Sequence, residues 1–460
     1  MPPKSPVSPA YVLGVGLTKF VKPRGKIDYT ELGYEAGIKA LLDAHITYDD
    51  IDQGVACYCY GDTMCGQRVF YQFGMTGIPI FNQNSNCATA SSGIALARQF
   101  VSHGAADCVL VVGFEKMNSG SLGSFFKDRT NPLQRTLELS YKMRPKNDSP
   151  WAAQLFAGVA QFYIDEHGAE PRDFAEISRI NHEHSKNNPY SQFQDIYTLD
   201  QIMEAQMIDA PLTKYQCCPT SDGGAAAVIV SQAFLDARPE LKSQAILIAG
   251  QGMVSDSPSA FDGNPTSLVG GPMIRELTTD VLKEAEIKSI HDIKLIELHD
   301  CFSSAEMMTI DALGLSKPGK PHEYVRAGNI TYGGRTLINP SGGLLAKGHP
   351  LGATGLAQCA ELVWHLRGWA NNRMIEGTDS ALAQNSGLGS TTVITIYKRE
   401  DKKPSKKFSD AEVAKITGLG YNPAVQAKGF TKAQADKVCS RKARSEWALG
   451  ETHARVEARF

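Results

Sequence analysis

The chain has 460 residues, of which 42% are hydrophobic and 21% are charged. This is the composition of a globular protein, and the length allows two or three domains with substantial cores. The formal net charge of -2 gives no overall field that would favour nucleic acid or an anionic membrane as a partner. No apolar run approaches the roughly 18 residues that a membrane-spanning helix needs.

The ten cysteines are expected to be reduced thiols rather than a disulfide framework. The short, proline-rich start of the chain has no apolar segment typical of a secretory signal. Cys57, Cys59 and Cys65 are close enough in sequence to suggest zinc. No second Cys or His pair follows at a finger spacing, so the sequence predicts no metal site.

Strand-like and helix-like segments alternate along most of the chain. Apolar, β-rich runs predict strands at residues 11–18, 54–61, 108–115, 225–232, 245–253, 293–300 and 391–398. Segments with helical spacing lie between them at residues 30–45, 90–104 and 355–369. Near-continuous apolar strands that alternate with helices indicate an α/β fold with buried sheets.

The two halves of the chain resemble each other in the order of their features. In the first half a strand leads through a turn into a helix that carries Cys87. In the second half a turn that contains His349 leads into a helix starting near Gly352. The pattern suggests a duplication, with halves at residues 1–240 and 241–399 and the active site between them.

Two segments fall outside this duplicated plan. Residues 117–215 are polar, and we interpret them as an inserted loop domain that covers the active-site mouth. Residues 400–460 form a basic tail, which we interpret as a solvated appendage with two short helices or, alternatively, as a docking or targeting segment. The tail ends in Ala458-Arg459-Phe460, which has the small–basic–hydrophobic order of a peroxisomal address but is not Ser-Lys-Leu.

Cys87 is the first candidate for chemistry. It follows a strand-like segment and precedes a helix of small residues. Unpaired N–H groups and the positive end of the helix dipole would lower the pKa of its thiol and favour the nucleophilic thiolate. Considered alone, the motif fits a buried, inert cysteine equally well.

Two further segments carry reactive side chains. His299 and Cys301 follow a predicted strand, at the end where α/β folds place ligands, although such residues are also found there without a function. A histidine can polarise a carbonyl, and a thiol can move a proton. His349 lies in a Gly-rich turn, before a proline that restricts its backbone, and is a plausible activator of Cys87.

Three motifs together resemble the hallmarks of the thiolase superfamily: NCAT at residues 86–89, HDCF at 299–302 and GGLLAKGHPLGATG at 342–355. HDCF, in place of the more usual NEAF, is similar to the thiolase domain of sterol carrier protein X. The resemblance extends from about residue 11 to residue 398. It implies two βαβαβαββ halves in five α-β-α-β-α layers, with a loop domain inserted in the first half.

The resemblance also implies a role for each reactive residue. Cys87 would be the nucleophile that carries the acyl group, and His349 would activate it and help to hold the thioester oxygen. His299 would help to bind the 3-keto or enolate oxygen. Cys301 would be the acid or base that protonates the departing enolate.

One segment departs from the family pattern. Degradative thiolases carry their acid or base in a Cys-x-Gly motif near the C-terminus, whereas residues 383–389 contain no cysteine. Gln384 stands where the sterol carrier thiolases usually have a histidine, which puts a direct catalytic side chain there in doubt. Backbone N–H groups near Asn385, together with that of Cys87, remain candidates for an oxyanion hole.

The family implies thiolysis of straight-chain or 2-methyl-branched 3-ketoacyl-CoA by coenzyme A in fatty acid or sterol side-chain β-oxidation. Coenzyme A is a substrate, and no metal or redox cofactor is expected. A peroxisomal location is favoured over a mitochondrial or cytosolic one, and a homodimer or homotetramer is expected. The tail is about half as long as a sterol carrier domain, so lipid transfer is not expected.

Two alternatives remain open. A condensing enzyme or a retro-aldolase would share the fold, although retro-aldolases can dispense with the nucleophilic cysteine. A non-catalytic acyl-CoA- or lipid-binding partner would suit the polar insertion and the basic tail, but not a complete set of reactive residues.

Overall fold

The protein is described from a computed structural model, which covers residues 8–118, 123, 126, 128–389, 391–401, 403–450 and 452–457. Ten strands form its large central sheet, which confirms the α/β fold. The first half contributes β1 (Ala10–Leu17), β2 (Gln53–Cys57), β3 (Ile80–Gln83), β4 (Cys108–Glu115) and β7 (Gly223–Ser231). The second half contributes β8 (Ile246–Val254), β9 (Leu295–Glu297), β10 (Leu337–Ile338), β11 (Ser380–Gly387) and β12 (Thr391–Arg399).

The two halves of the sheet have the same topology. From the outer edge inward the strand order is β3-β2-β4-β7-β1 in one half and β10-β9-β11-β12-β8 in the other. In both halves the three outer strands are parallel and the two inner pairings are antiparallel. A short antiparallel pairing of Tyr11 with Leu247 and Val12 with Ile246 joins the halves. This repeated order is what a duplicated chain would produce.

Helices lie on both faces of each half-sheet and between them, which gives the five layers. Those of the core are α1 (Tyr29–Ala44), α2 (Cys65–Phe70), α3 (Thr89–Ser102), α8 (Gln232–Asp236), α9 (Pro265–Leu268), α10 (Gly271–Glu284), α11 (Ser303–Ala312), α12 (Pro321–Arg326) and α13 (Thr354–Arg367). The central layer consists of α3 and α13, which share one buried core with strands from both halves. Both candidate loops, before α3 and before α13, therefore lead into the middle of the molecule.

Equivalent glycines let the outer helices approach the sheet. A side chain at Gly14 of β1 would lie 2.4 Å from the carbonyl oxygen of Ala40 in α1, and one at Gly250 of β8 would lie 2.5 Å from that of Val281 in α10. Only glycine permits such an approach of helix and strand backbones. The same device at the first strand of each half is further evidence of duplication.

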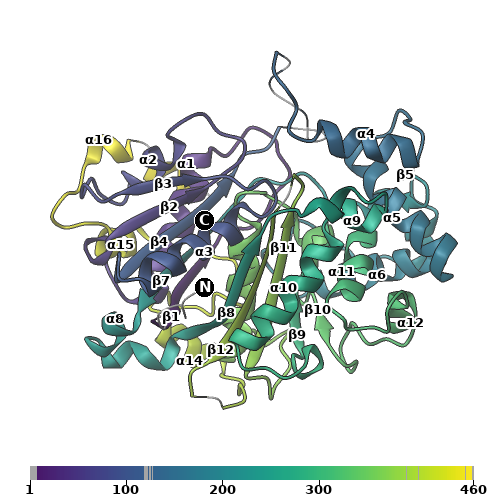
Figure 1. The fold of residues 1–460 in the computed structure, drawn as a ribbon. Helices are drawn as coiled ribbons and strands as arrows, with labels where there is room; N and C mark the ends of the chain where they lie inside the picture. Colours follow the sequence, from purple (N-terminus) through teal and green to yellow (C-terminus); the bar gives the residue numbers. More distant parts are fainter. Residues whose placement is uncertain are drawn as a thin grey trace, which may run out of the picture.

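The inserted segment leaves the first half but packs against the second (Figure 1). It contains α4 (Gln134–Met143), α5 (Trp151–His167), α6 (Pro171–Ser185), α7 (Leu199–Met203), β5 (Met207–Asp209) and β6 (Leu212–Thr213). The ring of Phe156 stacks on that of Phe302 at 4.8 Å, and the hydroxyl of Tyr163 donates to Asp311 at 2.9 Å. The segment thus crosses between the halves near the predicted reactive residues.

The interpretation of the tail as a solvated appendage with two short helices is wrong. The tail forms four helices, α14 (Asp410–Ile416), α15 (Lys432–Val438), α16 (Glu446–Leu449) and α17 (Thr452–Glu457). Tyr421, Phe430 and Val438 belong to the core formed by α1 and the outer face of the first half-sheet. Apolar residues at irregular spacing anchor the tail, while its charged side chains remain exposed. The net charge of the segment therefore did not indicate that part of it is buried.

Removing one of these anchors should destabilise the whole protein. Phe430 is 5% exposed and packs edge-on against Tyr34. Phe430→Ala is expected to lower the free energy of unfolding by about 3–5 kcal/mol, because a large apolar side chain leaves a cavity. The matched control is Trp447→Ala, since Trp447 is 84% exposed and should change stability by less than about 0.5 kcal/mol. Equal effects in urea unfolding followed by circular dichroism would contradict the packed tail.

Candidate active site

Cys87 lies in the turn between β3 and α3, and its side chain is 4% exposed. The preceding Asn86 has a φ of 52°, and its amide donates to the carbonyl oxygen of Leu388 at 2.8 Å. This hydrogen bond ties the Cys87 turn to the connection between β11 and β12 in the other half. The backbone N–H groups of Cys87 and Leu388 both approach the sulfur, where they lower the pKa of the thiol.

These N–H groups do not outweigh burial. Loss of hydration, with a further contribution from the buried Glu115, raises the pKa of the Cys87 thiol to about 12. The expectation of a lowered thiol pKa is therefore wrong for the free protein. The helix α3 begins only at Thr89, so Cys87 gains little from the helix terminus while losing most contact with water. The resting nucleophile is a thiol, and a base must take its proton.

His349 has the geometry of that base. Its ring Nδ1 lies 2.7 Å from the hydroxyl of Thr354, and this hydroxyl donates its only hydrogen to the carbonyl oxygen of Pro350 at 3.0 Å. Nδ1 must therefore carry the hydrogen, which leaves a lone pair on Nε2. Nε2 is buried and has no hydrogen-bond partner within the described part of the chain. Burial, together with His299 and Lys347, lowers the pKa of His349 well below its usual value, so the ring is neutral.

His299 lies just beyond β9, on a loop rather than on a continued strand. The backbone N–H of Leu298 donates to Asn339 Oδ1 at 2.8 Å, and that of His299 donates to Gln384 Oε1 at 3.1 Å. Beyond β9, hydrogen bonds to side chains thus replace the hydrogen bonds between strands, and the chain turns toward the site. Gln384, where the sequence analysis doubted a catalytic side chain, is buried and positions the backbone of His299.

The imidazole of His299 is oriented by Asn385. Its Nδ1 lies 2.7 Å from Asn385 Oδ1, an acceptor, and the amide of Asn385 donates to Ser91 Oγ at 3.2 Å. The neutral ring therefore carries its hydrogen on Nδ1 and a lone pair on Nε2. Burial lowers the pKa of His299 to about 4. The side chain of Asn385 is thus engaged with His299.

Three of the predicted site residues converge. The sulfur of Cys87 and one ring nitrogen each of His299 and His349 all lie within 4.8 Å of one another. The two imidazoles meet edge to face, with centroids 5.2 Å apart and an interplanar angle of 81°. A buried thiol and two neutral imidazoles from separate loops of both halves form a site for proton transfer and nucleophilic attack.

Cys301 lies next to this cluster, with a second thiol beside it. The backbone N–H of Cys218 donates to the carbonyl oxygen of Cys301 at 2.9 Å. Burial raises the pKa of Cys301 well above its usual value, and the neighbouring thiol groups of Cys218 and Cys87 raise it further. Cys301 therefore keeps its proton at neutral pH. Cys218 could not be predicted from local sequence, because it lies beside Cys301 only where the chain that follows the insertion packs against the second half.

Two buried carboxylates fix the loops that carry these residues. Asp300 accepts hydrogen bonds from the backbone N–H groups of Leu344 and Leu345 at 2.7 and 3.2 Å. Glu115, at the end of β4, accepts from Gly352 at 2.9 Å and also from the backbone of Cys59 and Tyr60. Burial raises the pKa of each carboxyl to about 7. Asp300 holds the loop before His349 and Glu115 holds the loop after it, and no motif spacing predicts either role.

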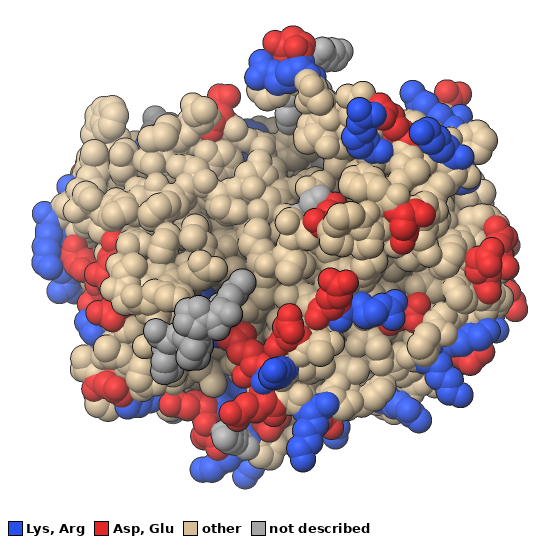
Figure 2. All heavy atoms as spheres, viewed as in Figure 1, with Lys and Arg blue, Asp and Glu red and all other residues tan. Residues whose placement is uncertain are grey.

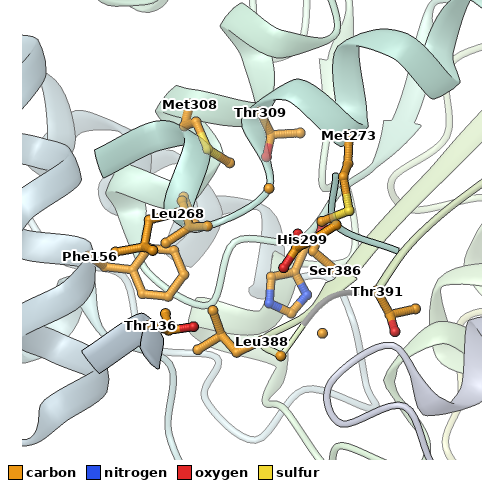
Figure 3. Close-up of a pocket in the computed structure, with 16 residues that line it drawn as sticks. Thr136, Phe156, Leu268, Met273, His299, Met308, Thr309, Ser386, Leu388 and Thr391 are labelled. Atoms are coloured by element: carbon orange, nitrogen blue, oxygen red, sulfur yellow. The ribbon is translucent and has the colours of Figure 1, made fainter. Parts of the chain in front are cut away.

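A pocket opens beside His299, as Figure 3 shows. Its apolar wall comes from the insertion, α9, α10, α11 and the turn after β11, and includes Phe156, Leu268, Met273, Met308 and Leu388. Thr136, Thr309, Ser386 and Thr391 add hydroxyl groups. The pocket reaches the reactive cluster at His299, and Phe156 shows that the insertion forms part of it.

The raised pKa of the Cys87 thiol predicts how its alkylation rate depends on pH. Alkylation requires the thiolate, whose fraction grows tenfold per pH unit below the thiol pKa. The rate of Cys87 carbamidomethylation by iodoacetamide is therefore expected to rise about tenfold per unit between about pH 7 and pH 10. Peptide mapping would follow Cys87 alone. A rate that is already constant above pH 7 would instead indicate a preformed thiolate–imidazolium pair.

Comparison with known families identifies this arrangement. The thiolase N-terminal domain matches residues 11–233, and the thiolase C-terminal domain-like family matches residues 273–399. The chain belongs to the thiolase family, and the prediction of an acyltransferase of that family is confirmed. The resemblance to the sterol carrier protein type is confirmed as well.

Several relatives are similar over most of the chain. Sterol carrier protein 2 of Gallus gallus is 48% identical over 390 residues, which are 84% of this chain and 71% of the relative. Its Homo sapiens counterpart is 45% identical over 421 residues, 90% of this chain and 77% of the relative. Non-specific lipid-transfer protein-like 2 of Caenorhabditis elegans is 40% identical over 402 residues, 86% of this chain and 97% of the relative.

Solved structures show the fold at greater distance. The Ltp2-ChsH2(DUF35) aldolase has a TM-score of 0.71 at 24% identity, covering 86% of this chain and 98% of that one. Human mitochondrial 3-ketoacyl-CoA thiolase has a TM-score of 0.63 at 17% identity, covering 85% of this chain and 99% of that one. Because an aldolase and a thiolase share the fold, the reaction must be argued from the site.

Proposed function

We propose that the protein is a 3-ketoacyl-CoA thiolase, which uses coenzyme A to cleave straight-chain or 2-methyl-branched 3-ketoacyl-CoA. The observation that carries the proposal is the convergence of Cys87, His299 and His349, with a pocket of mixed polar and apolar lining beside His299. A nucleophilic thiol with a neutral base fits a covalent acyl-enzyme.

The first step moves a proton and forms a carbon–sulfur bond. His349 Nε2 takes the thiol proton as the sulfur of Cys87 attacks the 3-keto carbon. The backbone N–H groups of Cys87 and Leu388 lie against the sulfur and would stabilise the oxyanion that forms next to it. Leu388, rather than Asn385, would be the second backbone donor, because its N–H approaches the sulfur, whereas Asn385 lies within strand β11.

The second step breaks the Cα–Cβ bond and releases the enolate of acetyl-CoA or propionyl-CoA. The protonated His349 now has a hydrogen on Nε2, and it would keep this proton while donating a hydrogen bond to the enolate oxygen. A neutral His299 has only a lone pair on Nε2, so it would reach this oxygen through a bound water or after protonation. Once Cys301 has protonated the enolate, the thiol of coenzyme A would give its proton to the Cys301 thiolate and attack the acyl-Cys87 thioester. The bond between the acyl carbon and Cys87 breaks, and the Cys87 sulfur takes back its proton from His349. No step requires a metal or a redox cofactor.

Cys301 would protonate the α-carbon of the enolate. Its raised pKa keeps the required proton in place, and its carbonyl oxygen is fixed by Cys218. Cys301→Ala is expected to lower the thiolysis rate about 10²–10⁴-fold. Labelling of Cys87 by iodoacetamide should persist in this variant, and near-normal turnover would remove Cys301 from the mechanism.

The products test the proposed reaction. With 3-ketohexadecanoyl-CoA and free coenzyme A, the expected products are acetyl-CoA and an acyl-CoA shortened by two carbons. A retro-aldolase would instead leave this substrate uncleaved and coenzyme A unconsumed, because retro-aldol cleavage requires a 3-hydroxyl group. Mass spectrometry with isotopically labelled coenzyme A separates these outcomes, and cleavage that leaves free coenzyme A unchanged would reject thiolysis. Condensation is the reverse of this reaction and uses the same residues.

A homodimer is proposed from an unpaired strand edge. β3 is the outermost strand of the first half, and Phe81 on it is 40% exposed and lies against Phe100 of α3. The middle and upper part of the face in Figure 2 carries few charged side chains. Such an edge is a template for a second copy. Light scattering that gives a monomer at micromolar concentration would oppose this proposal.

The cellular role is proposed to be peroxisomal β-oxidation of fatty acids or sterol side chains. Ala458-Arg459-Phe460, on which the location partly depends, lies outside the described residues. In the described part of the chain, the helices are too short or too polar to cross a membrane. Loss of peroxisomal import after deletion of the three residues would support the proposal, and unchanged import would oppose the signal.

A further inference from the structure

The cluster at the centre of the site has the composition of a zinc centre. One thiol and two imidazoles supply a sulfur and two nitrogens, all within 4.8 Å of one another and all buried. Thiolate and imidazole are the ligands that Zn²⁺ prefers in proteins, and three such ligands with one open position are typical of reactive zinc sites. This cluster differs from Cys57, Cys59 and Cys65, which were the residues whose spacing suggested zinc in the sequence.

The outer hydrogen bonds match those of metal sites. In both histidines Nδ1 is engaged, by Asn385 Oδ1 in His299 and by Thr354 Oγ1 in His349. A metal-binding histidine almost always donates its other N–H to such a partner, which orients the ring and increases the basicity of the ligating nitrogen. Nε2 of His349 is buried without a partner in the described part of the chain and is available as a ligand.

We infer that Cys87, His299 and His349 bind Zn²⁺ in the free protein and that this binding inhibits the enzyme reversibly. In a tetrahedral site with Zn–S of about 2.3 Å and Zn–N of about 2.0–2.1 Å, neighbouring ligand atoms lie about 3.3–3.6 Å apart. Small side-chain rotations, closing gaps of about 1.5 Å at most, bring the three atoms to these distances. The thiol proton leaves to the solvent as the Zn–S bond forms, and no oxidant or reductant is involved.

Metal binding and catalysis exclude each other at this site. Zn²⁺ occupies the lone pairs that attack the substrate and accept the thiol proton, so the ion competes with acylation of Cys87. An acyl group on Cys87 removes the sulfur ligand and prevents binding. The inhibition rests on the proposed function, whereas the binding does not, so the two are measured separately.

Binding is measured without substrate, by competition of the apoprotein with a fluorescent zinc chelator. Relative to wild type, Cys87→Ala is expected to weaken the affinity at least about 100-fold, and Thr354→Val, which removes the partner of Nδ1, about 10–100-fold. The matched control is Cys301→Ala, whose sulfur is outside the cluster and which should retain the affinity within about threefold. Wild-type protein alkylated at Cys87 provides a second test that does not depend on refolding of a variant.

Replacement of Zn²⁺ by Co²⁺ gives a spectroscopic test. A thiolate-to-cobalt charge-transfer band is expected in wild type and in Cys301→Ala, and is expected to be absent from Cys87→Ala and from the alkylated protein. Equal chelator-derived affinities for wild type and Cys87→Ala would overturn the inference, as would a cobalt spectrum without sulfur coordination. Thiolysis that remains normal at a saturating zinc concentration would overturn the inhibition but leave thiolase activity established.

Discussion

Replacing Cys87 by alanine is expected to reduce thiolysis at least about 10⁴-fold, because the nucleophile and its base act as a unit whose loss removes the covalent route. The substitution removes one sulfur atom from a small apolar cluster with Met117 and Leu351, so the fold should persist. The rate is measured as coenzyme A-dependent loss of 3-ketoacyl-CoA at saturating substrate.

A matched cysteine variant separates loss of the nucleophile from loss of a thiol in general. Cys65 lies on α2, is buried, and is not part of the reactive cluster. Cys65→Ala should keep the wild-type rate within about threefold, as expected of a substitution remote from the reacting atoms. If Cys87→Ala retained a tenth of the wild-type rate, the covalent mechanism would be refuted.

His349→Ala is expected to have the second largest effect, a loss of about 10²–10⁴-fold in kcat, because it removes the general base and the later donor to the enolate. The raised pKa of Cys87 makes this base necessary, since very little thiolate forms without it at neutral pH. Single-turnover acylation under excess enzyme isolates the step in which the thiol loses its proton.

Thr354→Val provides the control for orientation. It keeps an imidazole at position 349 but removes the acceptor of Nδ1–H, so the lone pair is no longer held on Nε2. An intermediate loss of about tenfold or more in acylation is expected when a ring partner is removed. If His349→Ala acylated as fast as wild type, another residue would have to be the base.

The fold was predictable because its main determinants are local. The apolar runs that became β1, β4, β7, β8 and β12 are long, and their buried pairing leaves little choice of structure. The strands β10 and β11 were not predicted, because one has two residues and the other contains polar residues that serve the site. Packing of the tail depends on contacts with α1 that are distant in sequence.

The identity of the reactive residues was predictable, but their electrostatics were not. Motif spacing placed Cys87, His299, Cys301 and His349 at loop positions, and the structure brings three of them into contact range. The raised pKa of Cys87 follows from burial by both halves, which no local pattern contains. Gln384 holds His299 within the second half, and Leu388 accepts a hydrogen bond from the Cys87 turn of the first half, so both roles depend on contacts between segments distant in sequence.

Intact-mass spectrometry of the acyl-enzyme tests the central claim most directly. The protein is incubated with a 3-ketoacyl-CoA without free coenzyme A, and the mass increase is assigned by peptide mapping. The account predicts one acyl group, two carbons shorter than the substrate chain for a straight-chain substrate, on Cys87, discharged by added coenzyme A and absent from Cys87→Ala. An adduct on another residue, or one that persists in Cys87→Ala, would contradict it.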